Sequence, residues 1–190
     1  MSWPVRVGMG VAVLAALALG RAVESALPVA HTDNRPFLHT AGVGEPVHMR
    51  YADVTADAVR SARALDTPQG EVGTPGRWLI VSLTVTPRGR PLSSPAVSLQ
   101  DAKGRTFAVD ARSGYSWEAA PTGVRWQVDV PFEVPYDALP GAALLFSHNP
   151  NDDRRDDVAR IDLGLDAGDA ERLWATASTV EVSPAQMATS

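Results

Sequence analysis

The side chains of this chain that could bind a metal ion gather in the segment 149–157. Side-chain oxygens with the odd spacing of a calcium-binding loop stand there at four positions: Asn149, Asn151, Asp153 and Asp157. The calcium template places glycine at its sixth position and glutamate at its twelfth, where this chain has Arg154 and Arg160. Arginine repels a dication and neutralises neighbouring carboxylates. We therefore interpret the segment as a solvated turn, keep a weak calcium site as a remote alternative, and predict no metal or cofactor.

Side chains that could act as nucleophiles or bases are isolated from one another. Ser113 and Ser147 lie outside any Gly-x-Ser-x-Gly elbow, the turn that exposes a nucleophilic serine. Histidines occur at four positions without the His-x-x-x-His spacing of metal sites: His31, His39, His48 and His148. The sequence also lacks a glycine-rich strand-to-helix turn that could hold a phosphate. We therefore predict that the protein is not an enzyme and has no catalytic residues.

The composition limits the class of partners. The chain has 190 residues, no cysteine and a formal net charge of −5. Without cysteine there is no disulfide, no thiol catalysis and no lipid-modified cysteine. Basic residues are scattered among acidic ones, so the concentrated basic face of a nucleic-acid-binding protein is missing. We predict no nucleic-acid partner.

The N-terminal segment has the pattern of a targeting sequence. An uncharged run of apolar or small residues, 7–20, lies between Arg6 and Arg21. Its length suits the hydrophobic region of a signal peptide and is short for a full transmembrane helix. We predict that residues 1–26 form a hydrophobic helix that acts as an uncleaved signal-anchor, with a signal peptide cleaved after 18–20 as the alternative. The rest of the chain is then either a single-pass membrane protein with its domain outside the cytoplasm, or secreted.

The rest of the chain shows the two-residue alternation of half-buried β-strands. In Arg125–Pro135, every second residue is apolar, and the residues between them are polar or proline. The apolar positions are Trp126, Val128, Val130, Phe132 and Val134. Because Pro131 cannot donate to a β-ladder, we expect this strand near a sheet edge. The run 77–86 is apolar on both faces at its start, which predicts a central strand. About seven to eight such strands without intervening helices predict an all-β fold, an immunoglobulin-like antiparallel β-sandwich.

The patterns divide the chain after residue 26 into three parts. Residues 27–46 are rich in proline and glycine and are predicted to be a linker. Residues 47–165 hold the sandwich, with a loop expected at 67–76. Residues 166–190 form a C-terminal tail with a possible short helix at 170–177.

One long loop carries two aromatic residues, Tyr115 and Trp117, within 111–124. Loops on a rigid scaffold often display binding residues, and aromatic side chains provide large contact areas. We therefore predict Tyr115 and Trp117 as interaction residues. The alternative is that one or both fold back and cap the end of the sandwich.

Three segments in a fixed order carry a family resemblance: the strand 78–86, the hairpin 98–105 with Leu99, Asp101 and Gly104, and the proline-capped strand 130–135. Together they resemble a family of bacterial extracytoplasmic immunoglobulin-like domains of unknown function, similar to a telokin-like secreted antigen domain. The chain departs from the family at 86–89, where members usually have an asparagine turn. The resemblance implies an immunoglobulin-like fold, export and frequent attachment to the membrane, and it implies no catalytic residues.

These observations predict a membrane-tethered extracytoplasmic immunoglobulin-like module that binds or assists another protein, without chemistry of its own. Its predicted partners are the membrane, through the N-terminal helix, and a protein of the cell envelope. The alternative is a purely structural subunit or spacer of a cell-envelope complex, which makes its contacts through the N-terminal helix or the C-terminal tail.

Overall fold

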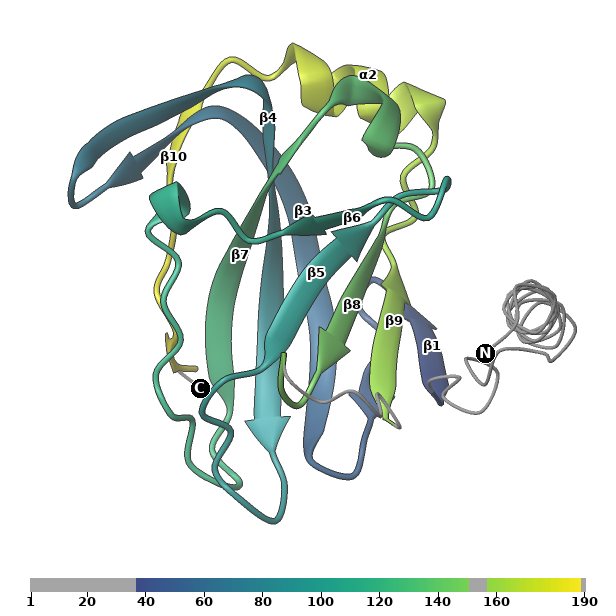
Figure 1. The fold of residues 1–190 in the computed structure, drawn as a ribbon, viewed down its shortest axis with the longest axis vertical. Helices are drawn as coiled ribbons and strands as arrows, with labels where there is room; N and C mark the ends of the chain where they lie inside the picture. Colours follow the sequence, from purple (N-terminus) through teal and green to yellow (C-terminus); the bar gives the residue numbers. More distant parts are fainter. Residues whose placement is uncertain (1–36, 151–156, 189–190) are drawn as a thin grey trace, which may run out of the picture. The chain divides into compact units, whose positions relative to one another are not determined.

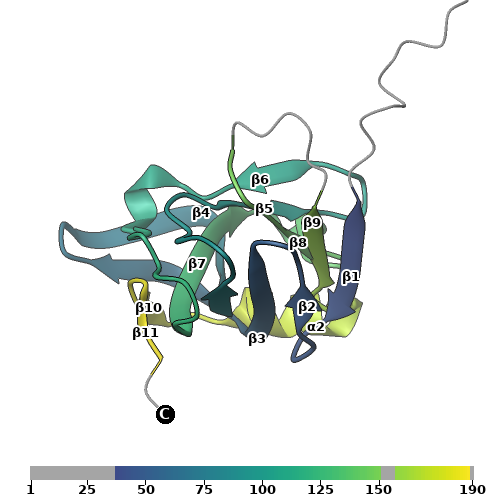
Figure 2. The same ribbon diagram turned by 90° about the horizontal axis from the view of Figure 1, so that it is seen from below.

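The computed structural model describes residues 37–150 and 157–188, and in this part of the chain two β-sheets pack face to face (Figure 1). The first sheet contains, in spatial order, β1 (Leu38–Gly42), β9 (Val158–Asp162), β8 (Ala143–Ser147), β5 (Ala96–Gln100) and β6 (Thr106–Ala108). The second contains β10 (Thr179–Glu181), β3 (Ala52–Thr67), β4 (Gly70–Pro87), β7 (Trp126–Val134) and β11 (Gln186–Met187), and β2 (Val47–His48) pairs with β3. Figure 2 shows the two layers from below. The predicted β-sandwich is confirmed.

Alternating side chains of β4 and β7 fill the space between the sheets. Leu79, Val81, Leu83 and Val85 of β4, with Val128, Val130, Phe132 and Val134 of β7, belong to one buried cluster. Burial of these apolar groups is the main force that holds the two sheets together. Strand β7 pairs with β4 along its whole length, and on its other side its only strand partner among the described residues is the two-residue β11. It therefore lies close to a sheet edge, as Pro131 predicts.

The outer face of the second sheet carries a smaller core. Trp78 and Ile80 are buried there beside Leu65, and Val180 and Val182 from the C-terminal part of the chain cover them. Strand β4 lies between β3 and β7 and is buried on both faces at this point. The central strand predicted from the run 77–86 is therefore present.

The C-terminal part of the chain belongs to the sandwich. Helix α2 (Ala167–Ala175) begins after Asp166, whose side chain accepts the backbone N–H of Asp169 in a capping box. The expected short helix is present, but it starts and ends earlier than the range 170–177. Strands β10 and β11 then pair with β3 and β7, so the region predicted to be a tail extends the second sheet at both edges.

The sandwich also begins earlier than the sequence pattern indicates. Residues 38–42, predicted to be part of a linker, form β1, which pairs with β9 in parallel from Leu38↔Val158 to Gly42↔Asp162. Most side chains of this edge strand face water, so its sequence shows no apolar alternation. The segment forms a strand because its backbone pairs with β9.

The loop expected at 67–76 is a hairpin. Strands β3 and β4 pair up to Thr67↔Gly70, and only a two-residue turn joins them. Gly76 is required by close packing, because a Cβ atom there would collide with the carbonyl oxygen of Val134 in β7. The glycines and prolines of this segment therefore mark special positions within strands.

The hydrophobic helix predicted at 1–26 lies outside the described residues. Among residues 37–150 and 157–188, no helix has the length and apolar character needed to cross a membrane.

Candidate functional site

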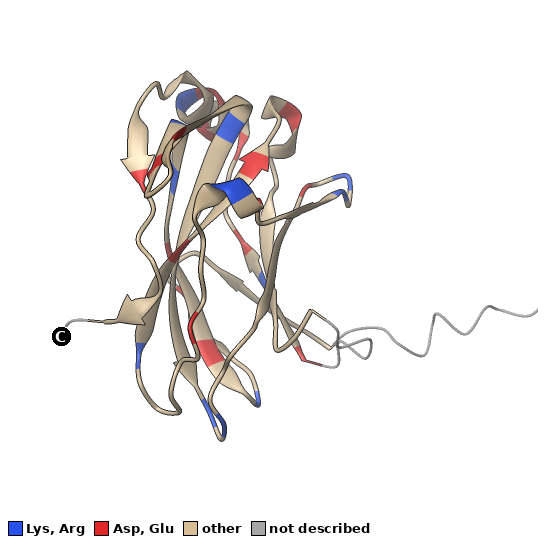
Figure 3. Cartoon of the chain, turned by 60° about the vertical axis from the view of Figure 1, so that its left-hand side comes forward, with Lys and Arg blue, Asp and Glu red and all other residues tan. Residues whose placement is uncertain are grey.

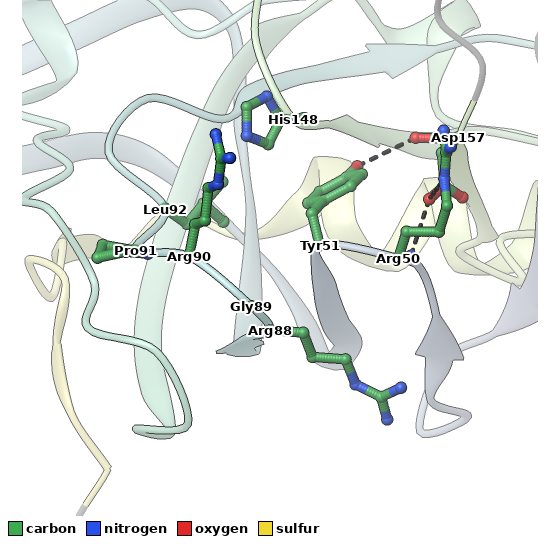
Figure 4. A pocket seen from close by; sticks show the side chains of 9 residues that line it. All are labelled: Arg50, Tyr51, Arg88, Gly89, Arg90, Pro91, Leu92, His148 and Asp157. Atoms are coloured by element: carbon green, nitrogen blue, oxygen red, sulfur yellow. Dashed lines mark hydrogen bonds and ion pairs between the residues drawn. The ribbon is translucent and has the colours of Figure 1, made fainter.

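Loops from both sheets meet at the end of the sandwich where β4 and β8 end, the end that Figure 2 views. They enclose a cavity of about 340 Å³, which is the size of a small-ligand site (Figure 4). We call this cavity the arginine pocket and define it by six of the residues that line it: Arg50, Tyr51, Arg88, Arg90, Leu92 and His148.

A tight turn in the loop after β4 separates two of the pocket arginines. The backbone N–H of Arg90 donates to the carbonyl oxygen of Arg88 at 2.7 Å, which makes a γ-turn centred on Gly89. Gly89 has φ +69°, a conformation that costs glycine little and other residues more. Figure 4 shows the result: the Arg90 side chain extends on the His148 side of the pocket, and Arg88 extends the other way.

The loop that carries these arginines is held in place by backbone and side-chain hydrogen bonds. Leu92 and Ala120 exchange two backbone hydrogen bonds, of 3.0 and 2.9 Å, and the indole Nε1–H of Trp117 donates to the Leu92 carbonyl oxygen at 2.9 Å. On the other side, the N–H of Arg88 donates to the Tyr51 carbonyl oxygen at 2.7 Å. The wall of the pocket is therefore largely formed before any ligand binds.

Of the two predicted interaction residues, Trp117 lies behind this wall, and Tyr115 follows Gly114, which lies against Thr67 of the β3–β4 hairpin. Tyr115 and Trp117 are half-buried and pack against the core between the sheets. The Tyr115 hydroxyl is buried without a hydrogen-bond partner in the part of the chain that the structure describes, and burial raises its pKa to about 12. Neither residue lines the arginine pocket. Their direct contact with a partner stays a prediction, and the structure gives Trp117 a supporting position.

A buried carboxylate fixes the floor on the other side of the pocket. Asp157 is 5% exposed, and its Oδ2 accepts the backbone N–H of Arg50 at 2.8 Å and Nε–H at 3.3 Å. Its Oδ1 lies 2.8 Å from His39 Nε2. Asp157 thus joins β1, the turn before β3 and the start of β9, and it orients the Arg50 side chain.

The same contacts bear on the calcium-like segment of the sequence. Both oxygens of Asp157 already bind donors of the protein, and the candidate ligands at positions 151 and 153 lie outside the described residues. Among the residues that the structure describes, no group of three or more histidine, aspartate or glutamate side chains is arranged to hold a metal ion.

A second cavity of about 520 Å³ adjoins the arginine pocket and shares Arg50, Arg88 and Asp157 with it. We call it the histidine groove and define it by the residues that only this cavity contains: Phe37, His39, His48 and Met49. The Phe37 side chain at its rim is 73% exposed. Three of the four histidines therefore gather at this end of the sandwich, and His31 lies outside the described residues.

Among the described residues, two of the three arginines around the two cavities form ion pairs with aspartates. Arg50 pairs with Asp157, and Arg88 pairs with Asp53 at 2.7 Å. No ion pair joins the Arg90 guanidinium to any side chain of residues 37–150 or 157–188, so three arginines face two described carboxylates. Elsewhere in the described domain, acidic and basic residues are interspersed (Figure 3).

The chemistry of this site is that of anion recognition. Arg90 offers only donors, in the planar fork that matches a carboxylate or phosphate group. The half-buried Tyr51 ring adds apolar surface, and it contacts His148 edge-on at 5.2 Å between centroids. This site was not among the sequence predictions, because its lining residues come from segments that are far apart in the chain.

The fold and the site define a β-sandwich domain with a cation-lined cavity at one loop end. No protein family model matches the sequence, and no curated protein matches it. The crystal structure of the yjhA protein from Bacillus subtilis is similar, with 11% identity, 64% of this chain and 99% of that chain covered, and a TM-score of 0.47. An uncharacterized β-sandwich protein from Clostridium difficile 630 has 9% identity, with 66% and 95% covered and a TM-score of 0.41. Both likenesses concern the β-sandwich only.

Proposed function

We propose that the protein is a membrane-tethered extracytoplasmic immunoglobulin-like module that recognises a cell-envelope protein through the arginine pocket. One observation carries the proposal: Arg50, from the turn before β3, and Arg90, from the loop after β4, line one preformed cavity at an end of the sandwich. Binding residues are commonly displayed on loops in this way. A cavity with a few convergent polar groups is the usual form of a ligand site.

The family resemblance supports the immunoglobulin-like part of this proposal. Its hairpin motif has a folding role here: Leu99 is buried in the core, and Asp101 accepts the backbone N–H groups of Lys103 at 2.9 Å and Arg105 at 2.8 Å. Gly104 has φ +80°, as the end of this turn requires. The motif therefore specifies a hairpin of the sandwich, and the proposed binding site lies in other loops.

The tethered, extracytoplasmic part of the proposal rests on the sequence of residues 1–26. The apolar run 7–20 between two arginines has the pattern of a signal-anchor. We propose a single-pass protein of the cell membrane with the sandwich outside the cytoplasm, and secretion after cleavage is the alternative.

A second candidate function is a structural subunit that makes its contacts through the C-terminal part of the chain. The observation in its favour is Met187 in β11, whose apolar side chain is 65% exposed at the edge of the second sheet. Exposed apolar groups at a sheet edge are frequent contact points between chains.

Co-purification of the full chain from membranes separates the two candidates. The informative variants are Arg90→Glu in the pocket, Met187→Glu at the sheet edge, and Arg125→Glu as a control on an exposed residue at the pocket end, outside the cavity. We expect Arg90→Glu to lose the envelope proteins that the wild type and Arg125→Glu retain, with equal thermal stability. If Met187→Glu alone loses them, the structural-subunit function is correct and the pocket is not the recognition site.

A further inference from the structure

We infer that the group bound in the arginine pocket is a carboxylate on a segment of the partner protein, flanked by an apolar side chain that enters the histidine groove. This inference rests on the proposed function, because it names the chemistry that the same site recognises. It follows from the ion pairs of the three arginines and from the positions of the apolar side chains beside them.

Arg90 is the arginine whose charge the described residues leave uncompensated. Arg50 and Arg88 are each oriented by a carboxylate of the protein. Asp53, which pairs with Arg88, also lies 2.7 Å from His48 Nδ1. Arg90 lies in the same pocket without an ion pair to the described residues. A guanidinium in this state binds an incoming carboxylate through two parallel hydrogen bonds.

The planar fork of the Arg90 guanidinium matches the two oxygens of a carboxylate. His148, which lines the pocket, can donate a further hydrogen bond to the same anion.

Apolar surface lies on either side of Arg90 and Arg88. In the pocket this surface is the half-buried Tyr51 ring, and in the adjoining groove it is the exposed ring of Phe37. The two cavities share residues, so one extended segment can occupy both. A segment with an acidic residue beside an aromatic or aliphatic one matches this sequence of surfaces.

The test uses the full chain, labelled with nitrogen-15, in a neutral detergent. The probe is N-acetyl-Ala-Asp-Phe-Ala-amide, and its matched control is the same peptide with asparagine in place of aspartate. Binding is followed by the NMR signals of the Arg90 Nε–H group and the Leu92 amide. We expect the aspartate peptide to bind at least ten times more tightly than the asparagine peptide. Arg90→Gln should abolish this difference, and Arg125→Gln should retain it.

Equal binding of the two peptides, or an equal difference in Arg90→Gln and Arg125→Gln, would overturn the inference. Inorganic phosphate and vesicles of phosphatidylglycerol are the further arms. If either perturbs the Arg90 signal and the aspartate peptide does not, the pocket binds phosphate groups instead. A failed peptide titration together with partner loss in Arg90→Glu sinks the carboxylate inference and leaves the binding module standing. If the aspartate peptide binds but Arg90→Glu retains the envelope partners, the carboxylate inference stands and the proposed recognition of a partner through the pocket fails.

Discussion

The indole N–H of Trp117 donates a hydrogen bond of 2.9 Å to the carbonyl oxygen of Leu92, and this bond joins the long loop after β6 to the wall of the arginine pocket. Leu92 is 2% exposed and also exchanges two backbone hydrogen bonds with Ala120. Trp117 therefore influences the pocket through Leu92. A Trp117 substitution can change binding through this support, without any direct contact between Trp117 and a partner.

Replacement of Trp117 by phenylalanine tests this relationship. Trp117→Phe keeps most of the aromatic packing and removes the N–H donor, so we expect about 0.5–1.5 kcal/mol lower unfolding free energy, as for one lost hydrogen bond. We also expect faster hydrogen exchange of the Leu92 and Ala120 amides, because their pairing loses a neighbouring restraint. Trp174→Phe in α2 is the control, since Trp174 is half-buried at a site outside the pocket. Unchanged exchange in Trp117→Phe would show that the wall does not depend on the indole.

The strands that could be predicted from the sequence are those whose side chains reach a core. In β7 and the second half of β4, alternation of side-chain direction converts burial directly into an apolar pattern with period two. Strands β1 and β10 could not be predicted in this way. Each is short, and each pairs in parallel with a strand far away in the sequence. Backbone hydrogen bonds stabilise them, and these bonds leave no mark on the residue types.

The candidate site could be predicted even less well, for a related reason. Arg50, Arg90 and His148 come together only because their loops end at the same side of the sandwich, so no local spacing connects them. The sequence drew attention to Trp117 as an aromatic residue in a long loop. Its hydrogen-bond partner Leu92 lies 25 positions earlier, and that distance concealed its supporting position.

A second prediction concerns the attachment of the C-terminal segment to the second sheet. The Asp129 carboxylate is buried, accepts the Ser82 hydroxyl at 2.6 Å and the Ser183 N–H at 3.0 Å, and pairs with Arg60. Asp129→Ala leaves these donors unpaired, so we expect the unfolding free energy to fall by about 1–3 kcal/mol. Urea denaturation measures the loss, and faster amide exchange at 179–187 would show that the segment is released.

The control for Asp129 lies on the same outer face of the sheet. Asp57 is exposed and accepts the Thr84 hydroxyl at 2.7 Å, so Asp57→Ala should change the unfolding free energy by less than about 0.5 kcal/mol. Equal losses in the two variants would mean that the buried position of Asp129 has no special role in holding the C-terminal segment.

A third prediction concerns alkaline stability and the phenol of Tyr115. Burial raises its pKa from 10.0 to about 12, so between these pH values the unfolded chain loses a proton that the folded chain keeps. The contribution of Tyr115 to the free energy of unfolding is therefore complete below pH 10. Between pH 10 and pH 12 this contribution falls by up to about 1.4 kcal/mol per pH unit. Tyr115→Phe removes this dependence. It should also equal or exceed the wild type in stability at neutral pH, because the hydroxyl has no partner among the described residues. Tyr136→Phe, at an exposed position, is the matched control for loss of a hydroxyl. Urea denaturation across this pH range measures the slopes, and parallel slopes for wild type and Tyr115→Phe would refute the assignment to the Tyr115 phenol.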